Sequence, residues 1–345
     1  MTRRSTAAPS RGFLRRVLRA PSYGWVTEDN RPSDAVIRAE WRRNLAVWND
    51  RRHGLTAFTW GVWAVLVGVL GIWIVGFSTW ASLVAGLVYA FLFLPQYGTF
   101  YFHRYGVHGA WKYRHPGFGF LAKHAAIRLI PEEVYIVSHH VHHAYADRDG
   151  DPYDPRGGWW YCFLADANHQ GIAWDLDEAD HARAVRMLRW VPVRTGSYAT
   201  YRRTGMLAEP LTLVLDFAGN WLFWGTVLWG LGGWSLVLGV FGWCSAWLWG
   251  IRNFNFRAHG RGEDLRVEGE DLHRGDLSVN RTLSAWLASE WHNNHHLFPR
   301  SARNGFLWWQ LDVVWWVVRV LALFGVVAAY RDDSTAFEDL YRVHR

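Results

Sequence analysis

Ser138-His139-His140-Val141-His142-His143 holds four imidazoles within five residues, and the rest of the chain is interpreted from this stretch. If the stretch is helical, positions i, i+3 and i+4 share a face, so His139, His142 and His143 point at one place. Such convergence indicates a metal site, although histidine-rich runs also occur on solvated surfaces. The same H-x-x-H-H spacing recurs at His292-Asn293-Asn294-His295-His296, and this repetition favours the metal site.

The composition favours an integral membrane protein built as one large domain. Half of the 345 residues are hydrophobic and 25 are tryptophan, a residue that concentrates where an apolar surface meets water. The net charge of +7 comes from basic residues scattered among apolar runs. This pattern argues against a nucleic-acid partner and favours an anionic membrane surface, lipid headgroup or thioester carrier. Two cysteines are too few for a disulfide framework, so a metal in a reducing compartment would be bound by nitrogen.

Two pairs of apolar runs are long enough to cross roughly 30 Å of hydrocarbon. Residues 55–77 and 80–100 form the first pair around a short turn at Ser78-Thr79, and residues 211–229 and 234–251 form the second. Arginine and lysine gather at the outer ends of both pairs, which places those ends in the cytoplasm. We therefore expect an all-α membrane protein with four transmembrane helices in two hairpins.

All the histidine groups fall outside these spans and on their cytoplasmic side, an agreement that hydropathy alone does not require. We expect a cytoplasmic helical cap that holds a di-metal site. The expected division is a basic N-terminal segment at 1–54, a first hairpin at 55–100, cap parts at 101–206 and 252–345, and a second hairpin at 207–251.

Two further apolar segments are expected not to span the membrane. Residues 307–330 are interrupted by Gln310, Asp312 and Arg319, and because a charge at mid-bilayer is costly we expect an interfacial or packing helix there. Residues 13–19 are short and amphipathic, which predicts either an interfacial anchor or a frayed tail. The Arg-rich start, which includes Arg3 and Arg4, lacks the apolar core of a secretory signal, so we expect a cytoplasmic N-terminus.

The candidate ligands form four groups along the chain. They are His103 and His108, then His139, His142 and His143, then Asn255 with His259, and finally His292, His295 and His296. Nine imidazoles exceed the roughly four to six ligands that one transition metal takes, so the set fits two metals and water. All-nitrogen ligation with open positions suits redox-active iron, although zinc would bind the same set.

Further motifs accompany these histidines and carry a family resemblance. They are Asp151-Pro152, Ser278-Val279-Asn280, Glu290-Trp291, Phe298-Pro299-Arg300-Ser301-Ala302-Arg303 and Trp308-Trp309-Gln310-Leu311-Asp312. Over residues 101–330 the chain resembles the membrane fatty-acid desaturases of the acyl-CoA and acyl-lipid delta-9 type. The resemblance implies four membrane helices beneath a cytoplasmic cap with a di-iron centre. It also implies that Asn255 holds a metal-bound water and that the direct ligands are His103, His108, His139, His142, His143, His259, His292, His295 and His296.

The resemblance further implies an activity. Two iron ions, for which zinc could substitute in a recombinant preparation, would use O2 to form a cis double bond in a fatty acyl chain, with electrons from a separate ferredoxin or cytochrome b5-like protein. We expect the enzyme in a bacterial inner membrane, with the metal site and both termini cytoplasmic. The same centre could instead serve a lipid hydroxylase or acetylenase. A metal transporter or histidine-based sensor is the alternative from another class, and a transporter predicts ligands near mid-bilayer.

The chain departs from the family pattern in two places. Desaturases of this type usually read Asp-His-Arg at the start of the second box, whereas this chain has Ser138-His139-His140, and we expect His140 to lie beside the metal ligands or on the surface. Residues 157–170 lack the basic residues expected for an acyl-CoA headgroup, so CoA, acyl carrier protein and glycerolipid all stay open as carriers. Carboxylates that would orient the ligand imidazoles are Glu290, Asp147, Asp149 and Asp276.

Several other polar residues have structural interpretations. His115-Pro116-Gly117-Phe118 is similar to the haem-binding turn of cytochrome b5, but no such domain surrounds it. Asp216 and Asn220, one turn apart in the third apolar run, would form a helix–helix hydrogen bond or mark a polar point on a substrate path. The remaining histidines are treated as surface or structural residues: His53, His124, His169, His181, His273 and His344.

Overall fold

The computed structural model describes residues 11–343, and they are almost entirely helical. Arg3, Arg4 and His344 lie outside the described residues. The α-helices are α1 (Arg11–Leu14), α2 (Asp34–Asn44), α3 (Gly54–Ile72), α4 (Trp80–Val88), α5 (Leu94–Tyr97), α6 (Pro116–His124), α7 (Glu132–Tyr145), α8 (Trp159–Phe163), α9 (Ala165–Asn168), α10 (Glu178–Met187), α11 (Tyr198–Thr204), α12 (Pro210–Ala258), α13 (Leu283–Ala288), α14 (His292–Leu297), α15 (Val313–Leu323) and α16 (Ser334–Val343). The 3-10 segments are η1 (Arg51–His53), η5 (Pro155–Gly157) and η6 (Gly260–Gly262), and the π-helical segments are η2 (Trp73–Phe77), η3 (Tyr89–Phe93) and η4 (Gly98–Val107).

Three continuous helical stretches are long and apolar enough to cross a membrane: Arg51–Phe77, Trp80–Val107 and Pro210–Ala258. Their outward faces carry large apolar side chains, such as Val75 at 89% exposure and Leu222 at 73%. Side chains of this kind are stable against lipid and costly against water. The predicted apolar runs therefore form helices, and the third stretch covers both runs of the expected second hairpin.

The turn of the first hairpin lies where the sequence predicts it. Thr79 is the N-cap of α4, and its hydroxyl accepts a hydrogen bond from the Ser82 backbone N–H while the Ser82 hydroxyl accepts one from the Thr79 N–H. This reciprocal arrangement satisfies two backbone donors that the start of a helix otherwise leaves unpaired. Trp73 reaches across from η2 and donates its indole N–H to the Ser82 hydroxyl at 2.9 Å, which ties the two sides of the turn together.

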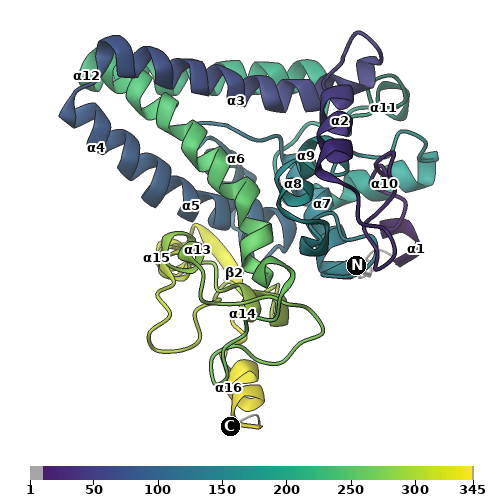
Figure 1. The fold of residues 1–345 in the computed structure, drawn as a ribbon. Helices are drawn as coiled ribbons and strands as arrows, with labels where there is room; N and C mark the ends of the chain where they lie inside the picture. The colour runs from purple at the N-terminus through teal and green to yellow at the C-terminus, as the bar shows by residue number, and fades with distance from the viewer. Residues whose placement is uncertain (1–10, 344–345) are drawn as a thin grey trace.

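Helix α12 breaks at the point between the two predicted apolar runs. Gly232 and Gly233 leave the helical conformation, and Gly233 has φ +62° and ψ −161°. An L-residue with a side chain rarely adopts this conformation, which is the reason for glycine here. One arm of α12 lies beside α3 and the other descends beside α4 towards α14 (Figure 1). The break therefore brings the chain back towards the histidine-bearing half of the molecule.

The apolar stretch near the C-terminus is too short to span a membrane, as expected. Helix α15 has 11 residues and is followed by strand β2 (Val327–Tyr330). This strand pairs antiparallel with β1 (Trp111–Tyr113), and Trp111 faces Tyr330 in the register. The small sheet was not predicted, because each strand is too short to show an alternating pattern. It ties the C-terminal segment to the residues that follow His108.

Both interpretations of residues 13–19 are wrong. Phe13, Leu14, Val17 and Leu18 are buried in the main hydrophobic core, and Leu18 forms a β-bridge with Ile172. The amphipathic pattern thus reflects packing against the rest of the protein and not insertion at a membrane surface. Burial of apolar side chains of this size stabilises the fold by about 1.5–3 kcal/mol each.

Asp216 and Asn220 join α12 to the segment that contains α6. Asp216 forms an ion pair with Lys123, and the Asn220 side-chain oxygen accepts a hydrogen bond from the Arg128 backbone N–H at 2.8 Å. Asn220 also donates to the Ala126 carbonyl oxygen at 3.0 Å. These contacts satisfy both polar side chains, which favours the structural interpretation over a polar point on a substrate path.

Candidate metal centre

Two groups of buried or half-buried histidines lie next to each other at the centre of the cap. In each group the candidate ligand atoms all lie within 4.8 Å of one another. The first group comprises His103, His108, His139, His143 and His295, and the second comprises His142, His259, His292 and His296. The ring centroids of His143 and His296, one from each group, are 4.5 Å apart. The structure thus brings all nine predicted histidines together in one place.

Three helices and two helix ends supply these side chains, and His108 follows the last residue of η4. The π-helical segment η4 carries His103, α7 carries the second box, α14 carries the third, and His259 follows the last residue of α12. In α7 the i, i+3 and i+4 spacing divides the second box, because His139 and His143 join one group while His142 joins the other. The third box divides in the same way, with His295 in the first group and His292 and His296 in the second, so each H-x-x-H-H motif serves both groups.

The imidazoles turn their Nε2 atoms inward. The Nε2 atoms of His103 and His139 lie 2.8 Å apart, those of His143 and His295 lie 2.9 Å apart, and those of His259 and His292 also lie 2.9 Å apart. The buried Nε2 atoms of His108 and His296 have no hydrogen-bond partner. Lone pairs that converge at such distances repel one another unless a proton or a metal ion lies between them. The donor set therefore fits bound transition-metal ions.

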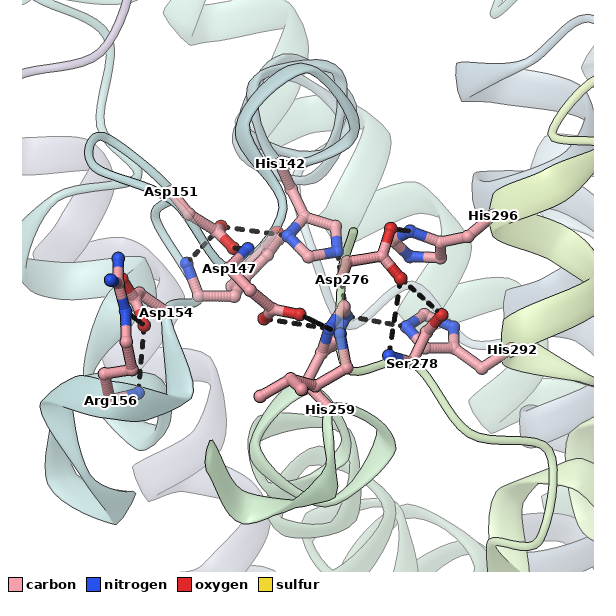
Figure 2. A network of polar contacts seen from close by, with 12 residues as sticks. His142, Asp147, Asp151, Asp154, Arg156, His259, Asp276, Ser278, His292 and His296 are labelled. Atoms are coloured by element: carbon pink, nitrogen blue, oxygen red, sulfur yellow. Dashed lines mark hydrogen bonds and ion pairs between the residues drawn. The ribbon is translucent and has the colours of Figure 1, made fainter. Parts of the chain in front are cut away.

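Four carboxylates lie within hydrogen-bond distance of the second ring nitrogen, Nδ1, of four of these histidines. The distances from Nδ1 to a carboxylate oxygen are 3.0 Å for His103 and Glu290, 2.9 Å for His142 and Asp151, 3.0 Å for His259 and Asp147, and 3.3 Å for His296 and Asp276. Three of these pairs can be followed in Figure 2. A carboxylate that accepts the Nδ1–H fixes the ring orientation and leaves Nε2 free for a metal.

The predictions for these carboxylates are right for Glu290, Asp147 and Asp276, and wrong for Asp149. The Asp149 side chain is 66% exposed and pairs with Arg156 on the surface. Asp151 takes the predicted role, and its side chain is fully buried. Its Oδ1 also accepts the Tyr153 backbone N–H, and its Oδ2 accepts the Asp147 backbone N–H, both at 2.8 Å. The Asp151-Pro152 pair is among the motifs that carry the family resemblance, and it could have identified Asp151 as a site residue.

Burial favours the neutral, metal-binding form of several of these histidines. Removal from water lowers the pKa of His139, His143 and His295 well below the usual range, and the neighbouring histidines lower it further. The pKa of His292 falls to about 3 mainly through burial. These four imidazoles are therefore neutral across the physiological pH range, whereas the pKa of His259, which burial lowers, is raised overall by the neighbouring Asp147 carboxylate.

A fully buried arginine, Arg104, holds the segment that carries Glu290 in place. Arg104 donates to both Asp312 carboxylate oxygens, at 2.9 and 3.0 Å, and to the Ala302 carbonyl oxygen at 2.7 Å. It also donates to the carbonyl oxygen of Ser289, the residue before Glu290. The rigid donor fork of arginine suits several acceptors at once, which explains why lysine would not replace it. The Gln310 and Asp312 side chains that exclude a membrane span are thus used inside the cap.

Two predicted neighbours of the metal site lie outside both groups. Asn255 is half-buried and lines a cavity with Tyr135, Tyr153 and Ile251. His140 is also half-buried, with its ring centroid 6.4 Å from that of His108. Its position agrees with the prediction that it lies beside the ligands and is not one of them.

The other histidines that were set aside have structural surroundings. His115 is the N-cap of α6, where its side chain accepts the Gly117 N–H, so the sequence similar to a haem-binding turn is a helix start. His169 is fully buried, lies 2.6 Å from the Pro152 carbonyl oxygen and stacks on Tyr161. His273 is exposed.

The sequence is similar to a family of known enzymes along most of its length. A sequence model of the "Fatty acid desaturase" family matches residues 78–331. Icosanoyl-CoA 5-desaturase of Limnanthes douglasii is 28% identical over 320 residues, which cover 86% of this chain and 77% of that protein. Acyl-CoA C20 Delta5-desaturase of Anemone leveillei is 30% identical over 261 residues, covering 68% and 69%. The sn-1 stearoyl-lipid 9-desaturase of Anabaena variabilis is 29% identical over 197 residues, covering 56% and 62%.

Proposed function

Because the chain belongs to the fatty acid desaturase family and is therefore an integral membrane enzyme, we propose that it uses O2 to introduce a cis double bond into a fatty acyl chain. The observation that carries this proposal is the double group of nine histidines, in which Nε2 atoms converge while carboxylates hold the Nδ1 atoms of four rings. Such a donor set suits a pair of redox-active metal ions. The metal is proposed to be iron.

The nine histidines would hold the two ions, and Asn255 would hold a water bound to one of them. Iron bound in this way supplies the oxidising power that removes hydrogen from two adjacent methylene groups. Burial favours the neutral form of rings such as His139, and Glu290, Asp151, Asp147 and Asp276 orient four of the nine rings. It also excludes water, since seven of the nine histidines are buried.

A few methylene groups of the acyl chain are proposed to lie in the cavity of about 60 Å³ that Asn255 lines. Its walls include Val134, Tyr135, Leu248 and Ile251, which are mostly apolar and sit beside the histidine groups. Phe163 lines this cavity and also an open apolar cavity of about 730 Å³ between α2, α3 and α8. We propose that the acyl chain enters through the larger cavity on the side of α3 and passes Phe163 towards the metal centre, so that shape selects the substrate.

The proposed topology has four transmembrane segments, with each arm of α12 crossing once. The cap, made of residues 101–206 and 252–345, would lie in the cytoplasm together with both termini, and the membrane would be the bacterial inner membrane. The positive charges beside the hairpin ends support this orientation. The electrons would come from a separate ferredoxin or cytochrome b5-like protein. The relatives include desaturases named for acyl-CoA and for acyl-lipid substrates, so the carrier is left to experiment.

Lipid profiling of cells that express the protein tests the reaction. We expect a new cis-unsaturated fatty acid with wild-type protein, none with His295→Ala, and the wild-type level with His273→Ala, an exposed histidine of the same C-terminal segment. Mass spectrometry reports the double-bond position and lipid class. Metal analysis of the purified wild type should find about two iron atoms per chain.

Other outcomes would indicate a different reaction at the same site, a transport function, or no desaturase activity. A hydroxylated or acetylenic lipid would indicate a hydroxylase or an acetylenase. Metal uptake into liposomes without O2 consumption would indicate a transporter. Wild-type protein that contains no iron and leaves the lipids unchanged would refute the desaturase.

A further inference from the structure

The turn that carries Asp151 lies outside the helices and strands of the described chain. Its carboxylate orients His142, so the position of the turn affects the position of that ring. Pro152 is buried in this turn, and the residue three positions later is Pro155, which has no N–H to donate back to the Pro152 carbonyl oxygen. The following N–H, that of Arg156, is donated to a neighbouring carboxylate at 2.9 Å. The buried carbonyl therefore needs a donor from elsewhere in the molecule.

One later segment of the chain supplies donors to three successive carbonyl oxygens of this turn. His169 Nε2 lies 2.6 Å from the Pro152 carbonyl oxygen, the Tyr161 hydroxyl donates to that of Asp151 at 3.4 Å, and the Cys162 thiol donates to that of Tyr153 at 3.2 Å. The three donor side chains are at most 3% exposed. The longer hydroxyl contact and the thiol contact are weaker hydrogen bonds. His169 is therefore the main external donor to the turn.

The His169 ring has one orientation and one tautomer. Its centroid lies 4.2 Å from that of Tyr161 with an interplanar angle of 19°, and the Trp25 ring lies edge-on to it at 5.8 Å. Because a carbonyl oxygen offers only lone pairs, the proton of the ring is on Nε2. Burial lowers the pKa of His169 to about 4, so the ring is neutral and has this single N–H. Its buried Nδ1 atom has no hydrogen-bond partner in the described part of the chain.

The other side of the turn contacts the metal centre through two carboxylates. Asp151 Oδ1 lies 2.9 Å from His142 Nδ1, and Asp151 Oδ2 accepts the Asp147 backbone N–H at 2.8 Å. Asp147 in turn lies 3.0 Å from His259 Nδ1. Both histidines belong to the second group. A shift of the turn would therefore disturb two carboxylates that orient two rings of the same group.

We propose that His169 is a positioning residue of the metal centre, which holds the turn through the Pro152 carbonyl and so keeps His142 in its ligating orientation. This role rests on the proposed function, because the orientation of the ring matters only where it binds a metal ion. Removal of the His169 N–H would leave a buried carbonyl without a donor, and the turn would move to regain one from water. The donor comes from residues 157–170, the segment in which the chain departs from the family pattern.

The test measures Co2+ binding to the purified full-length protein in detergent, against graded concentrations of a chelator. His169→Phe keeps a flat ring against Tyr161 and removes the donor, and we expect one of two bound ions to be held about fivefold or more weakly. His169→Gln keeps an N–H donor and should stay within about twofold of wild type. The matched control is His181→Phe, because His181 is also buried and lies 5.0 Å from a tyrosine ring, that of Tyr201. It should leave both affinities unchanged.

Two further measurements separate positioning from a general loss of stability. The visible absorption bands of bound Co2+ depend on ligand geometry, so they should shift in His169→Phe and not in His181→Phe, even if both variants melt at lower temperature. A double-mutant cycle with Asp151→Asn gives the second criterion. In that background His169→Phe should change the affinity by less than about twofold, because it acts through the same carboxylate.

The positioning role would be overturned by wild-type Co2+ affinity and absorption in His169→Phe, or by effects of His169→Phe and Asp151→Asn that simply multiply. If His169→Phe does not fold, Tyr161→Phe takes its place, because it removes only the hydroxyl donor to the Asp151 carbonyl. Its Co2+ bands should also shift, and unchanged bands would then overturn the role. Wild-type protein that binds no Co2+ would instead refute the proposed metal centre and with it the proposed function.

Discussion

At the scale of single residues, the site depends on which carboxylates reach the histidines. Asp147, Asp149 and Asp151 follow the second box within a few residues, yet only the first and last contact the site. Asp147 has φ +57°, so the chain reverses there and sends Asp149 outwards. Sequence spacing alone could not separate these three residues, because neither helical nor strand periodicity holds through such a turn.

This difference predicts unequal effects of two similar substitutions. Asp151→Asn removes the charged acceptor of the His142 Nδ1–H and should weaken metal affinity by about 10- to 100-fold. Asp149→Asn should leave the affinity unchanged, because Asp149 contacts only Arg156 on the surface. Iron per chain after dialysis against graded chelator concentrations measures both. Equal metal retention by the two variants would show that Asp151 does not orient a ligand.

At the scale of elements, most helices follow directly from the sequence, whereas their ends and breaks depend on a few residues. The first hairpin turn at Thr79 and the break in α12 both lie where the apolar runs stop. The pairing of β1 with β2 and the burial of residues 13–18 were not predictable, because both depend on contacts between distant segments. Local patterns carry no information about such partners.

The break in α12 should tolerate no side chain at its second glycine. Gly233→Ala forces an alanine into φ +62°, ψ −161° and should destabilise the protein by about 1–3 kcal/mol. Gly230→Ala lies three residues earlier, inside the helical part of this arm, where nothing lies within 4 Å of the added Cβ, and should be neutral or stabilising by up to about 1 kcal/mol. Thermal unfolding in detergent measures both. A Gly233→Ala protein as stable as wild type would mean that the break is not held by this conformation.

At the scale of the whole molecule, Glu133 joins the cap to the start of α12. Its Oε2 accepts the backbone N–H groups of Leu207 at 2.5 Å and Ala208 at 2.9 Å. The side chain is buried, and burial raises its pKa from 4.5 to about 7 although both N–H donors lower it. Between pH 4.5 and about 7, the Glu133 carboxyl group is therefore protonated in the folded protein and ionised in the unfolded chain.

The sign of this effect gives a pH prediction. Because the folded pKa is raised, the stability linked to Glu133 is fully present below pH 4.5 and is lost as pH rises through 7, a change of about 3 kcal/mol. Glu133→Gln keeps an acceptor for both N–H groups and removes the titration. We expect its melting temperature relative to wild type to increase between pH 5 and 8. Glu28→Gln, at an exposed position, should show no such trend. A constant difference across this range for Glu133→Gln would contradict the assignment.

The proposed topology predicts the sidedness of single cysteines. Ser78→Cys, at the first hairpin turn, and Leu231→Cys, at the break of α12, should react with a membrane-impermeant maleimide on intact spheroplasts. Asp149→Cys, on the exposed surface of the cap, should react only after lysis. The native Cys162 and Cys244 are buried and give a low background. A Leu231→Cys protein that reacts only after lysis would mean that the arms of α12 do not cross the membrane.

The sequence by itself determined the long apolar helices, the turn between the first two, the break between the arms of α12 and the nine histidines of the candidate centre. It could do so because hydropathy, glycine and the i, i+3, i+4 spacing act within a few residues of chain. Only the tertiary structure decided that each H-x-x-H-H box divides between two groups and that Asp151 and not Asp149 orients His142. These features depend on where separate elements pack in space, and no local pattern of residues encodes that placement.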